Sequence, residues 1–236
     1  MRVRRVGFVS SGLVVWSIWA GAAPAGAVDG VLDTSFSSDG MKYIDFGLAG
    51  ADDLGSSVAV DSRGRVVVAG RAAFSSINDD FGFARFLANG DNDTSFNSDA
   101  LQTVAFDAGP SGNRRDRAHD VAIQRDGKIV ACGTVEVDAA GGRELGVVRL
   151  LETGALDTSF SGDGKIQLNP VGGATRYEQE CSLVVRASGA IAVAWTADDL
   201  ATIGIFQLAS TGALDPSFGT GGVLSQTVTG EAELTD

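Results

Sequence analysis

Histidine is almost missing from this sequence, and several motifs on which common protein chemistry depends are missing with it. His119 is the only histidine among 236 residues, which excludes a zinc site built from several histidines. A Ser-His-Asp triad would have to use His119, and no Gly-x-Ser-x-Gly elbow accompanies it. There is also no P-loop and no Gly-x-Gly-x-x-Gly fingerprint opening a helix. We interpret His119 as a chance surface residue rather than a catalyst.

Basic residues are scarce, and three of them stand at the start of the chain. The sequence has 18 lysines and arginines against 30 acidic residues. Arg2, Arg4 and Arg5 precede a largely apolar stretch at residues 6–20 and a small-x-small site that ends at Ala27. This order is typical of an export signal, with a retained membrane anchor as the alternative. We expect residues 1–27 to be a signal peptide and the mature protein to be secreted or periplasmic.

Long apolar runs are absent after the leader. No stretch there approaches the roughly 18 apolar residues of a membrane helix, so we do not expect an integral membrane protein after signal cleavage. The mature part keeps 15 basic and 30 acidic residues, a net charge of −15, which disfavours nucleic acid and anionic membranes as partners. Aromatics make up only 7% of the sequence, glycine is abundant, and no helical periodicity is convincing. These features indicate a folded β-type chain.

What the sequence does contain is a repeat. A motif close to Gly-x-x-Asp-Thr-Ser-Phe occurs at residues 30–36, 90–96, 154–160 and 212–218, with Pro216 in place of Thr in the last copy. A fixed period near 60 residues indicates one supersecondary unit repeated along the chain. Asp before Thr or Pro favours a type I turn in which the carboxylate accepts a nearby backbone N–H. We predict structural turns capped by aspartate and anchored by buried phenylalanine, at Asp33, Phe36, Asp93, Phe96, Asp157, Phe160, Asp215 and Phe218.

A second pattern lies between the turn motifs. Residues 58–70, 121–133 and 183–195 each show an apolar strand, a turn with Gly64, Gly127 or Gly189, and another apolar strand. The second strand of each pair is apolar at successive positions, so both of its faces must be covered. A third strand precedes each later motif and a fourth follows it, at residues 81–87 and 101–107, 145–151 and 165–169, and 203–208 and 223–229.

Four antiparallel strands per unit, buried on both faces, are typical of propeller blades. We therefore predict an all-β, β-propeller-like array over residues 28–236, with units at about 58–108, 121–169 and 182–229. One extra N-terminal strand, at 41–46, precedes these three complete blades. Since single-chain propellers usually have about four to eight blades, the array should be an open arc. The chain should then form a homo-oligomer or be a fragment of a larger propeller.

The two linked patterns resemble the delta-60 repeat of exported bacterial proteins. The resemblance rests on Gly-x-Leu-Asp-Thr-Ser-Phe paired with Val-Ala-x-x-x-Asp-Gly-Lys-Ile-Val, and it spans about residues 28–230. It implies a propeller and an extracytoplasmic location, but no mechanism, because the function of that family is undefined. The third unit departs from the pattern, since Trp195 replaces its terminal glycine and residues 187–190 replace the Asp-Gly-Lys turn. A locally altered surface is expected there.

Two features offer alternatives to purely structural aspartates. Asp39 and Asp163 each follow a motif aspartate by six residues, as in a calcium loop, but Ala100 and Gly222 break this pattern in the other copies. An acidic residue also precedes the first strand of each unit, at Asp53, Asp116 and Glu178. These carboxylates would gather near one rim and bind cations or act as an acid/base pair, or they would lie in solvated loops beside Arg114, Arg115, Arg117 and Arg176.

The function predicted from these residues is an exported, non-enzymatic binding or structural module that presents propeller loops to a protein or glycan partner. It needs no cofactor. The alternative is a metal-assisted, Ca²⁺-dependent hydrolase or lyase acting from the acidic rim. Cys132 and Cys181 are the two cysteines, and an oxidising compartment favours a disulfide between them. A buried free thiol at Cys132 is the alternative.

Overall fold

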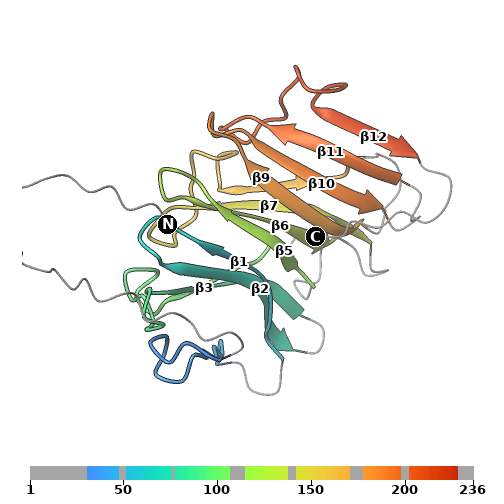
Figure 1. Cartoon of the computed structure of the whole chain (residues 1–236). Helices are drawn as coiled ribbons and strands as arrows, with labels where there is room; N and C mark the ends of the chain where they lie inside the picture. The colour runs from blue at the N-terminus through green and yellow to red at the C-terminus, as the bar shows by residue number, and fades with distance from the viewer. Residues whose placement is uncertain are drawn as a thin grey trace, which may run out of the picture.

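The computed structural model describes residues 31–47, 52–75, 78–106, 115–137, 142–170, 178–197 and 202–227. The predicted signal peptide lies outside these ranges. Within them the chain forms strands only (Figure 1). They are β1 (Leu54–Val60), β2 (Val66–Ser75), β3 (Asn78–Phe86), β4 (Leu101–Val104), β5 (Arg117–Ile123), β6 (Ile129–Glu136), β7 (Arg143–Leu150), β8 (Lys165–Leu168), β9 (Glu178–Val185), β10 (Ile191–Ala197), β11 (Thr202–Leu208) and β12 (Val223–Thr227).

The strands form three four-stranded antiparallel sheets, each a meander in sequence order. We name them blade 1 (β1–β4), blade 2 (β5–β8) and blade 3 (β9–β12). Figure 1 shows them side by side in an arc that does not close. The first strands β1, β5 and β9 lie next to one another along the inner side of this arc. The fold is therefore the predicted all-β, propeller-like array of three complete blades. The part of the chain that the structure describes holds no helix long and apolar enough to cross a membrane.

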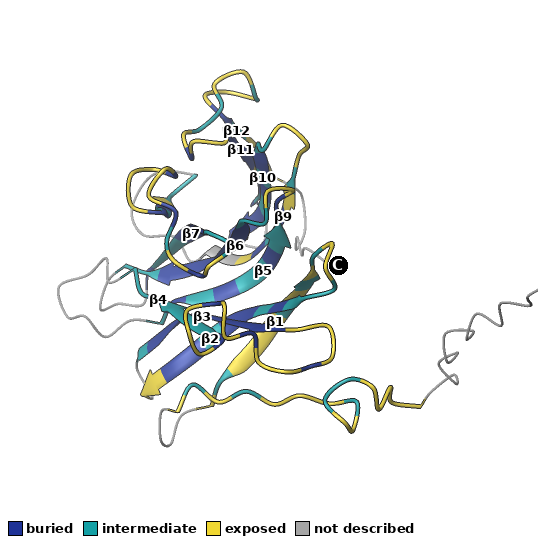
Figure 2. Ribbon diagram, turned by 90° about the vertical axis from the view of Figure 1, so that its left-hand side faces the viewer, coloured by how far each residue is buried: buried dark blue, intermediate teal, exposed yellow. Residues whose placement is uncertain are grey.

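The blades pack face to face, which explains why their central strands are apolar at successive positions. One core fills the space between blades 1 and 2 and includes Val67, Phe83 and Val148. A second core lies between blades 2 and 3 and includes Val130, Val193 and Phe206. Figure 2 shows the central strands of the array as largely buried and the connecting loops as exposed. The middle strands of blade 2, β6 and β7, thus supply side chains to both cores.

The predicted N-terminal strand at residues 41–46 is not formed. This segment is extended, but it has no ladder with any described strand. A strand exists only when a neighbouring backbone satisfies its N–H and C=O groups. The described residues contain no preceding sheet to which the segment could be added.

Residues 31–47 nonetheless occupy the place that the end of a preceding blade would have. The N–H of Ser37 donates to the carbonyl of Asn89 at 2.8 Å, and the N–H of Asn97 donates to Thr153 at 2.8 Å between blades 1 and 2. The ring of Phe46 also lies against Gly82 of β3. The segment therefore covers part of the outer face of blade 1.

Strand boundaries also differ from the prediction. The first strand of each blade begins about four residues earlier than expected, at Leu54, Arg117 and Glu178. In β1 and β5 a bulge interrupts the ladder, and pairing continues on its N-terminal side through residues 54–55 and 117–118, which the predicted strands did not include. In blades 1 and 2 the fourth strand is shorter than predicted and ends at Val104 and Leu168, respectively.

These bulges explain the glycines at the ends of two hairpins and the tryptophan in the third. A Cβ at Gly133 would lie 1.9 Å from the carbonyl oxygen of Arg117, and one at Gly70 would lie 1.8 Å from that of Leu54. Strand β9 is regular at the equivalent point, where Trp195 pairs with Cys181. A large side chain is therefore tolerated there.

Trp195 is fully buried and is not a surface feature, contrary to the expectation for the third unit. Its indole lies directly over Gly204. In blade 2 the equivalent glycine, Gly146, is covered by Phe106, which follows the fourth strand of blade 1. The residue that aligns with Phe106 one unit later is Pro170. Trp195 thus fills the space over Gly204 from within its own blade. In blade 2 the corresponding space over Gly146 is filled by an aromatic residue of the preceding blade.

Candidate functional site

The four motif aspartates cap turns in the same way. In each copy one carboxylate oxygen accepts the backbone N–H and the hydroxyl of the serine two residues on, at 3.0–3.1 Å and 2.6 Å respectively. The aspartates are Asp33, Asp93, Asp157 and Asp215. Asp39 and Asp163, the candidates for calcium loops, accept the N–H of Met41 and of Lys165 at 2.9 Å. The described residues contain no group of three or more His, Cys, Asp or Glu that could hold a metal ion.

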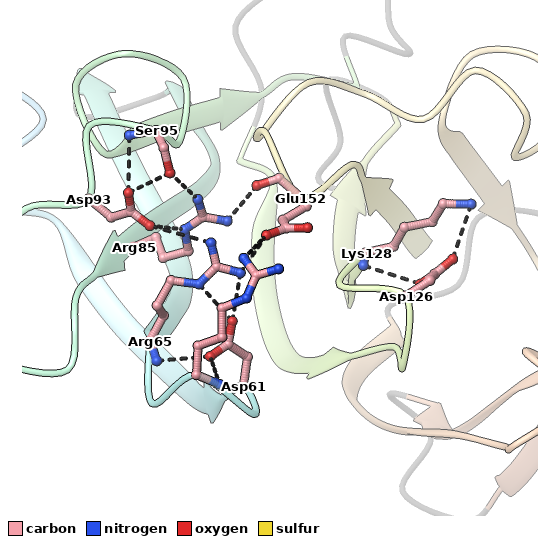
Figure 3. Close-up of polar contacts among 9 residues, drawn as sticks. Asp61, Arg65, Arg85, Asp93, Ser95, Asp126, Lys128 and Glu152 are labelled. Atoms are coloured by element: carbon pink, nitrogen blue, oxygen red, sulfur yellow. Dashed lines mark hydrogen bonds and ion pairs between the residues drawn. The ribbon is translucent and has the colours of Figure 1, made fainter.

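A buried arginine completes the motif in blades 1 and 2. Arg85 donates from Nε to the second oxygen of Asp93 at 2.7 Å and from Nη2 to the hydroxyl of Ser95 at 3.0 Å (Figure 3). Its guanidinium lies over the ring of Phe96, 4.8 Å from the ring centre. It also donates to the carbonyl of Glu152 in blade 2. The arginine therefore ties its own turn to the next blade.

The same arrangement recurs one blade later. Arg149 bonds Asp157 at 2.7 Å and Ser159 at 3.1 Å, lies 4.5 Å from the ring centre of Phe160, and donates to the carbonyl of Ser210 in blade 3. In blade 3 the equivalent residue is Gln207, which bonds Asp215 at 2.6 Å. The sequence prediction missed this residue. Its signal was available, because it stands eight residues before each of these three aspartates.

The motif phenylalanines differ in burial according to their place in the array. Phe96 and Phe160 are fully buried and lie against Gly154 and Gly212 of the next blade. Phe36 and Phe218 are only half-buried. Phe218 belongs to blade 3, whose outer face no described blade covers. Burial of this ring therefore depends on a following blade.

The acidic residues predicted to form a rim are structural ties. Asp116 is fully buried, and its two oxygens accept the N–H groups of Phe106 at 2.9 Å and Glu136 at 3.1 Å. Asp53 accepts the N–H groups of Phe46 and Ala73 at 2.9 and 3.0 Å. Each carboxylate thus joins the end of the preceding segment to the second strand of its own blade. The structure thus gives these two residues a tying role that neither the solvated loop nor the cation-binding rim included. The side chain of Glu178, like all of Arg114 and Arg176, lies outside the described part.

A cavity of about 310 Å³ lies where β1, β5 and β9 meet, and it contains His119 and Asp120. Asp120 accepts bonds from Ser57 at 2.8 Å, Ser182 at 3.1 Å and the N–H of Leu183 at 2.7 Å, so its carboxylate links all three blades. His119 is half-buried, which corrects its assignment to the surface, and its Nε2 lies 3.1 Å from the hydroxyl of Thr134.

The charge state of His119 limits what this cavity can do. Burial, followed by the nearby charges of Arg117 and Arg143, lowers the pKa of His119 to about 4. The imidazole is therefore neutral near pH 7. With Asp120 engaged by both neighbouring strands, the cavity has the features of a structural junction.

Two larger cavities open between the hairpin loops of neighbouring blades. The first seam cavity, between blades 1 and 2, measures about 380 Å³ and is lined by residues that include Arg63, Arg65 and Glu152. The second seam cavity, between blades 2 and 3, measures about 470 Å³ and is lined by residues that include Arg125 and Arg186. Both sizes fall in the range of small-ligand sites. These two cavities are the best candidate binding sites in the described residues.

Asp157, beside the second seam cavity, has a strongly lowered carboxylate pKa. Burial pushes this pKa upward, but the hydrogen bonds from Ser159, the charge of Arg149 and the bond from Lys128 outweigh burial and lower it to about 2. A depressed folded-state pKa contributes stability above the unfolded pKa near 3.9 that is lost as pH falls through the folded value.

We therefore expect the free energy of unfolding to fall by about 2 kcal/mol between pH 4 and pH 2 through Asp157 alone. Urea unfolding at a series of pH values measures this slope. In Asp157→Asn the slope should be visibly smaller, although that variant is less stable at pH 7. An equal slope in the two proteins would contradict the assignment.

Cys132 and Cys181 form a disulfide in the structure, with Cα atoms 6.3 Å apart. This bond joins β6 of blade 2 to β9 of blade 3 across their shared core. We expect the Cys132→Ala, Cys181→Ala double variant to lose about 2–4 kcal/mol, because the bond closes a long loop in the unfolded chain. Urea unfolding with and without reductant tests this, since reductant should destabilise the parent and leave the double variant unchanged.

Residues 64–96 and 124–160 match the model of a family described as a domain of unknown function (DUF5122) beta-propeller. The two segments run from the first hairpin turn to the motif phenylalanine in blades 1 and 2. They support a propeller repeat of the kind that the sequence resembled. The sequence matches no curated protein.

Among solved structures, the chain is similar to an exo-beta-1,3-galactanase from Clostridium thermocellum, with 12% identity and a TM-score of 0.45 over 79% of this chain and 39% of that one. It is also similar to an alpha-L-arabinofuranosidase from Lactobacillus brevis, with 12% identity and a TM-score of 0.41 over 72% and 52%. The chain thus spans less than two thirds of either protein. Similarity at this level says nothing about activity.

Proposed function

We propose that the chain is an exported, non-enzymatic binding module whose seam cavities and hairpin loops receive a ligand or partner. The proposal rests on the hydrogen-bond partners of the repeated carboxylates. Asp93 and Asp157 give both oxygens to serine and arginine, and Asp53 and Asp116 give both to backbone N–H groups. Acid/base catalysis needs a carboxylate that can reach a substrate.

The metal-assisted hydrolase or lyase is the second candidate, and it depended on an acidic rim. The two described rim carboxylates face the backbone of their own sheets. The charged groups of the second seam cavity, by contrast, are mainly arginine and lysine, together with hydroxyl side chains, and such groups bind anionic and hydroxylated ligands. In the first seam cavity, Asp61 and Glu152 are ion-paired with arginines of the same cavity. The geometry therefore favours binding over turnover.

Incubation of the exported chain with panels of polysaccharides and phosphoesters tests this function. We expect retention by a polysaccharide in affinity electrophoresis, no release of product, and no effect of Ca²⁺ on the melting temperature. Product release together with Ca²⁺-dependent stabilisation would instead support the hydrolase.

The outer face of blade 3 leads to a second proposal, on assembly. Val184, Ile205 and Leu224 are 62%, 39% and 57% exposed there. In blade 2, Val147 and Ile166, which correspond to Ile205 and Leu224, are 0% and 9% exposed because blade 3 covers them. An apolar patch of this kind marks an interaction surface.

We propose that a second copy of the chain covers this face. Exchange of the N-terminal segment is not needed, because residues 31–47 already lie against blade 1 of their own chain. Light scattering at micromolar concentration should show a dimer, and Ile205→Lys should dissociate it. A folded monomer at that concentration would contradict the proposal.

A further inference from the structure

The two seam cavities are built from equivalent parts of the repeat. Each is bounded by the hairpin of one blade, the hairpin of the next blade, and the loop before the next motif glycine. In both, an arginine on the third strand donates to the carbonyl of the same loop position, which is Glu152 in the first seam and Ser210 in the second. The backbone of Ser210 therefore stands where that of Glu152 stands one blade earlier.

In the first seam cavity a carboxylate of the chain itself occupies the centre. Glu152 lies 2.8 Å from Nη2 of Arg65 and also bonds Arg63 (Figure 3). Around it, the three cations Arg63, Arg65 and Arg85 are balanced by the three carboxylates of Asp61, Asp93 and Glu152. Arg125 and Asp126 belong to the hairpin that lines both cavities. The ion-paired charges of the first seam are therefore balanced by residues of the chain itself.

In the second seam cavity that internal carboxylate is missing. Ser210 replaces Glu152, and the hairpin position of Asp61 is Gln124. The cations are Arg125, Lys128, Arg149 and Arg186, against the carboxylates of Asp126 and Asp157.

Two of these cations are left over. Lys128 and Arg149 pair with Asp126 and Asp157. Arg125 and Arg186 form no ion pair with any described residue. Arg186 acts only at longer range on Asp215, which does not line the cavity and whose pKa is lowered first by hydrogen bonds from Ser217 and Gln207 and then by the charge of Arg186. The cavity therefore carries a local excess of positive charge in a chain whose net charge is −12.

We propose that the second seam cavity binds a small organic carboxylate, whose carboxyl group takes the place that Glu152 takes in the first seam. This inference rests on the proposed binding function and names its ligand class. Arginine guanidinium groups bind carboxylates through charge-assisted, often paired hydrogen bonds. The hydroxyls of Ser159, Ser188 and Ser210 line the remaining space, so a hydroxylated carboxylate such as a sugar acid suits the cavity better than an apolar one.

Isothermal titration of the whole exported chain with glucuronate tests the proposal, with glucose as the uncharged counterpart. We expect one site for glucuronate, weakened by added salt, and no measurable heat from glucose. Ser210→Glu supplies the missing internal carboxylate, so it should weaken glucuronate binding at least about tenfold and raise the melting temperature. Ser225→Glu, the same change on the exposed strand β12, is the matched control and should bind like the parent.

The reciprocal variant gives an independent readout. Glu152→Ser removes the internal carboxylate of the first seam, so it should create a second glucuronate site there. Equal binding of glucose, or unchanged affinity in Ser210→Glu, would overturn the inference. A chain that is retained by a panel polysaccharide but does not bind glucuronate would overturn it too, while the proposed binding function would stand.

Discussion

Replacing Phe160 by alanine is expected to lower the free energy of unfolding by about 3–5 kcal/mol, the usual cost of removing a core phenylalanine. The ring is fully buried, it lies against Gly212 of blade 3, and the guanidinium of Arg149 stacks over it. Its loss would leave a cavity at the junction of two blades and remove the cation–π contact. Urea unfolding of the parent and the variant measures the difference.

Phe218→Ala is the matched control, because Phe218 occupies the same motif position in blade 3 but is only half-buried. We expect it to cost about 1 kcal/mol, the typical effect of a substitution outside a core. A loss below about 1 kcal/mol for Phe160→Ala would show that the motif is a surface feature and not the junction between blades.

Arg149→Ala is expected to destabilise the chain by about 3–5 kcal/mol, because it leaves the buried carboxylate of Asp157 without its main partner. Arg149 and Asp157 are only 3% and 4% exposed. The substitution also removes the bond to Ser159 and the tie to the carbonyl of Ser210 in blade 3. Chemical denaturation at pH 7 gives the magnitude.

Two further variants separate the parts of this effect. Arg149→Gln reproduces the pair that Gln207 makes with Asp215 in blade 3, so it should recover about half of the loss. Arg125→Ala removes an exposed arginine from the same cavity and should change stability by less than about 0.5 kcal/mol. If Arg149→Ala were no more harmful than Arg125→Ala, the arginine would have no role in joining the blades.

Much of the fold can be predicted from the sequence because the same short motifs, with the same local interactions, recur several times. The Asp-x-Ser turn forms within three residues, so its hydrogen bonds follow from residue type alone. Hairpin glycines such as Gly127 stand at positive φ, where glycine is the favoured residue. The apolar runs of the second strands require cover on both faces, and stacking of blades is how the chain supplies it.

The errors of the sequence prediction fall where one unit meets the next. From the sequence alone, Asp53 and Asp116 resemble exposed acidic residues. In the structure each carboxylate accepts two backbone N–H groups that come from different segments of the chain. Residues 41–46 have the composition of a strand, but no sheet is present to pair with them. Trp195 departs from the repeat pattern, yet it is fully buried. The bulge of β9 falls beyond Trp195, between Thr196 and Ala197, whereas the bulge of β5 falls next to the pair that Gly133 makes.

The sequence by itself determined the repeat, the all-β class, the turn chemistry and the number of complete blades, since each depends on contacts between residues close in the chain. Only the tertiary structure decided which charges remain available for a ligand. Glu152 meets Arg63 and Arg65 across 89 and 87 residues, and the exchange of glutamate for Ser210 matters only because blades 2 and 3 enclose that position. Coulombic interactions depend on distance in space and on burial, and neither is fixed by the order of residues until the blades have packed.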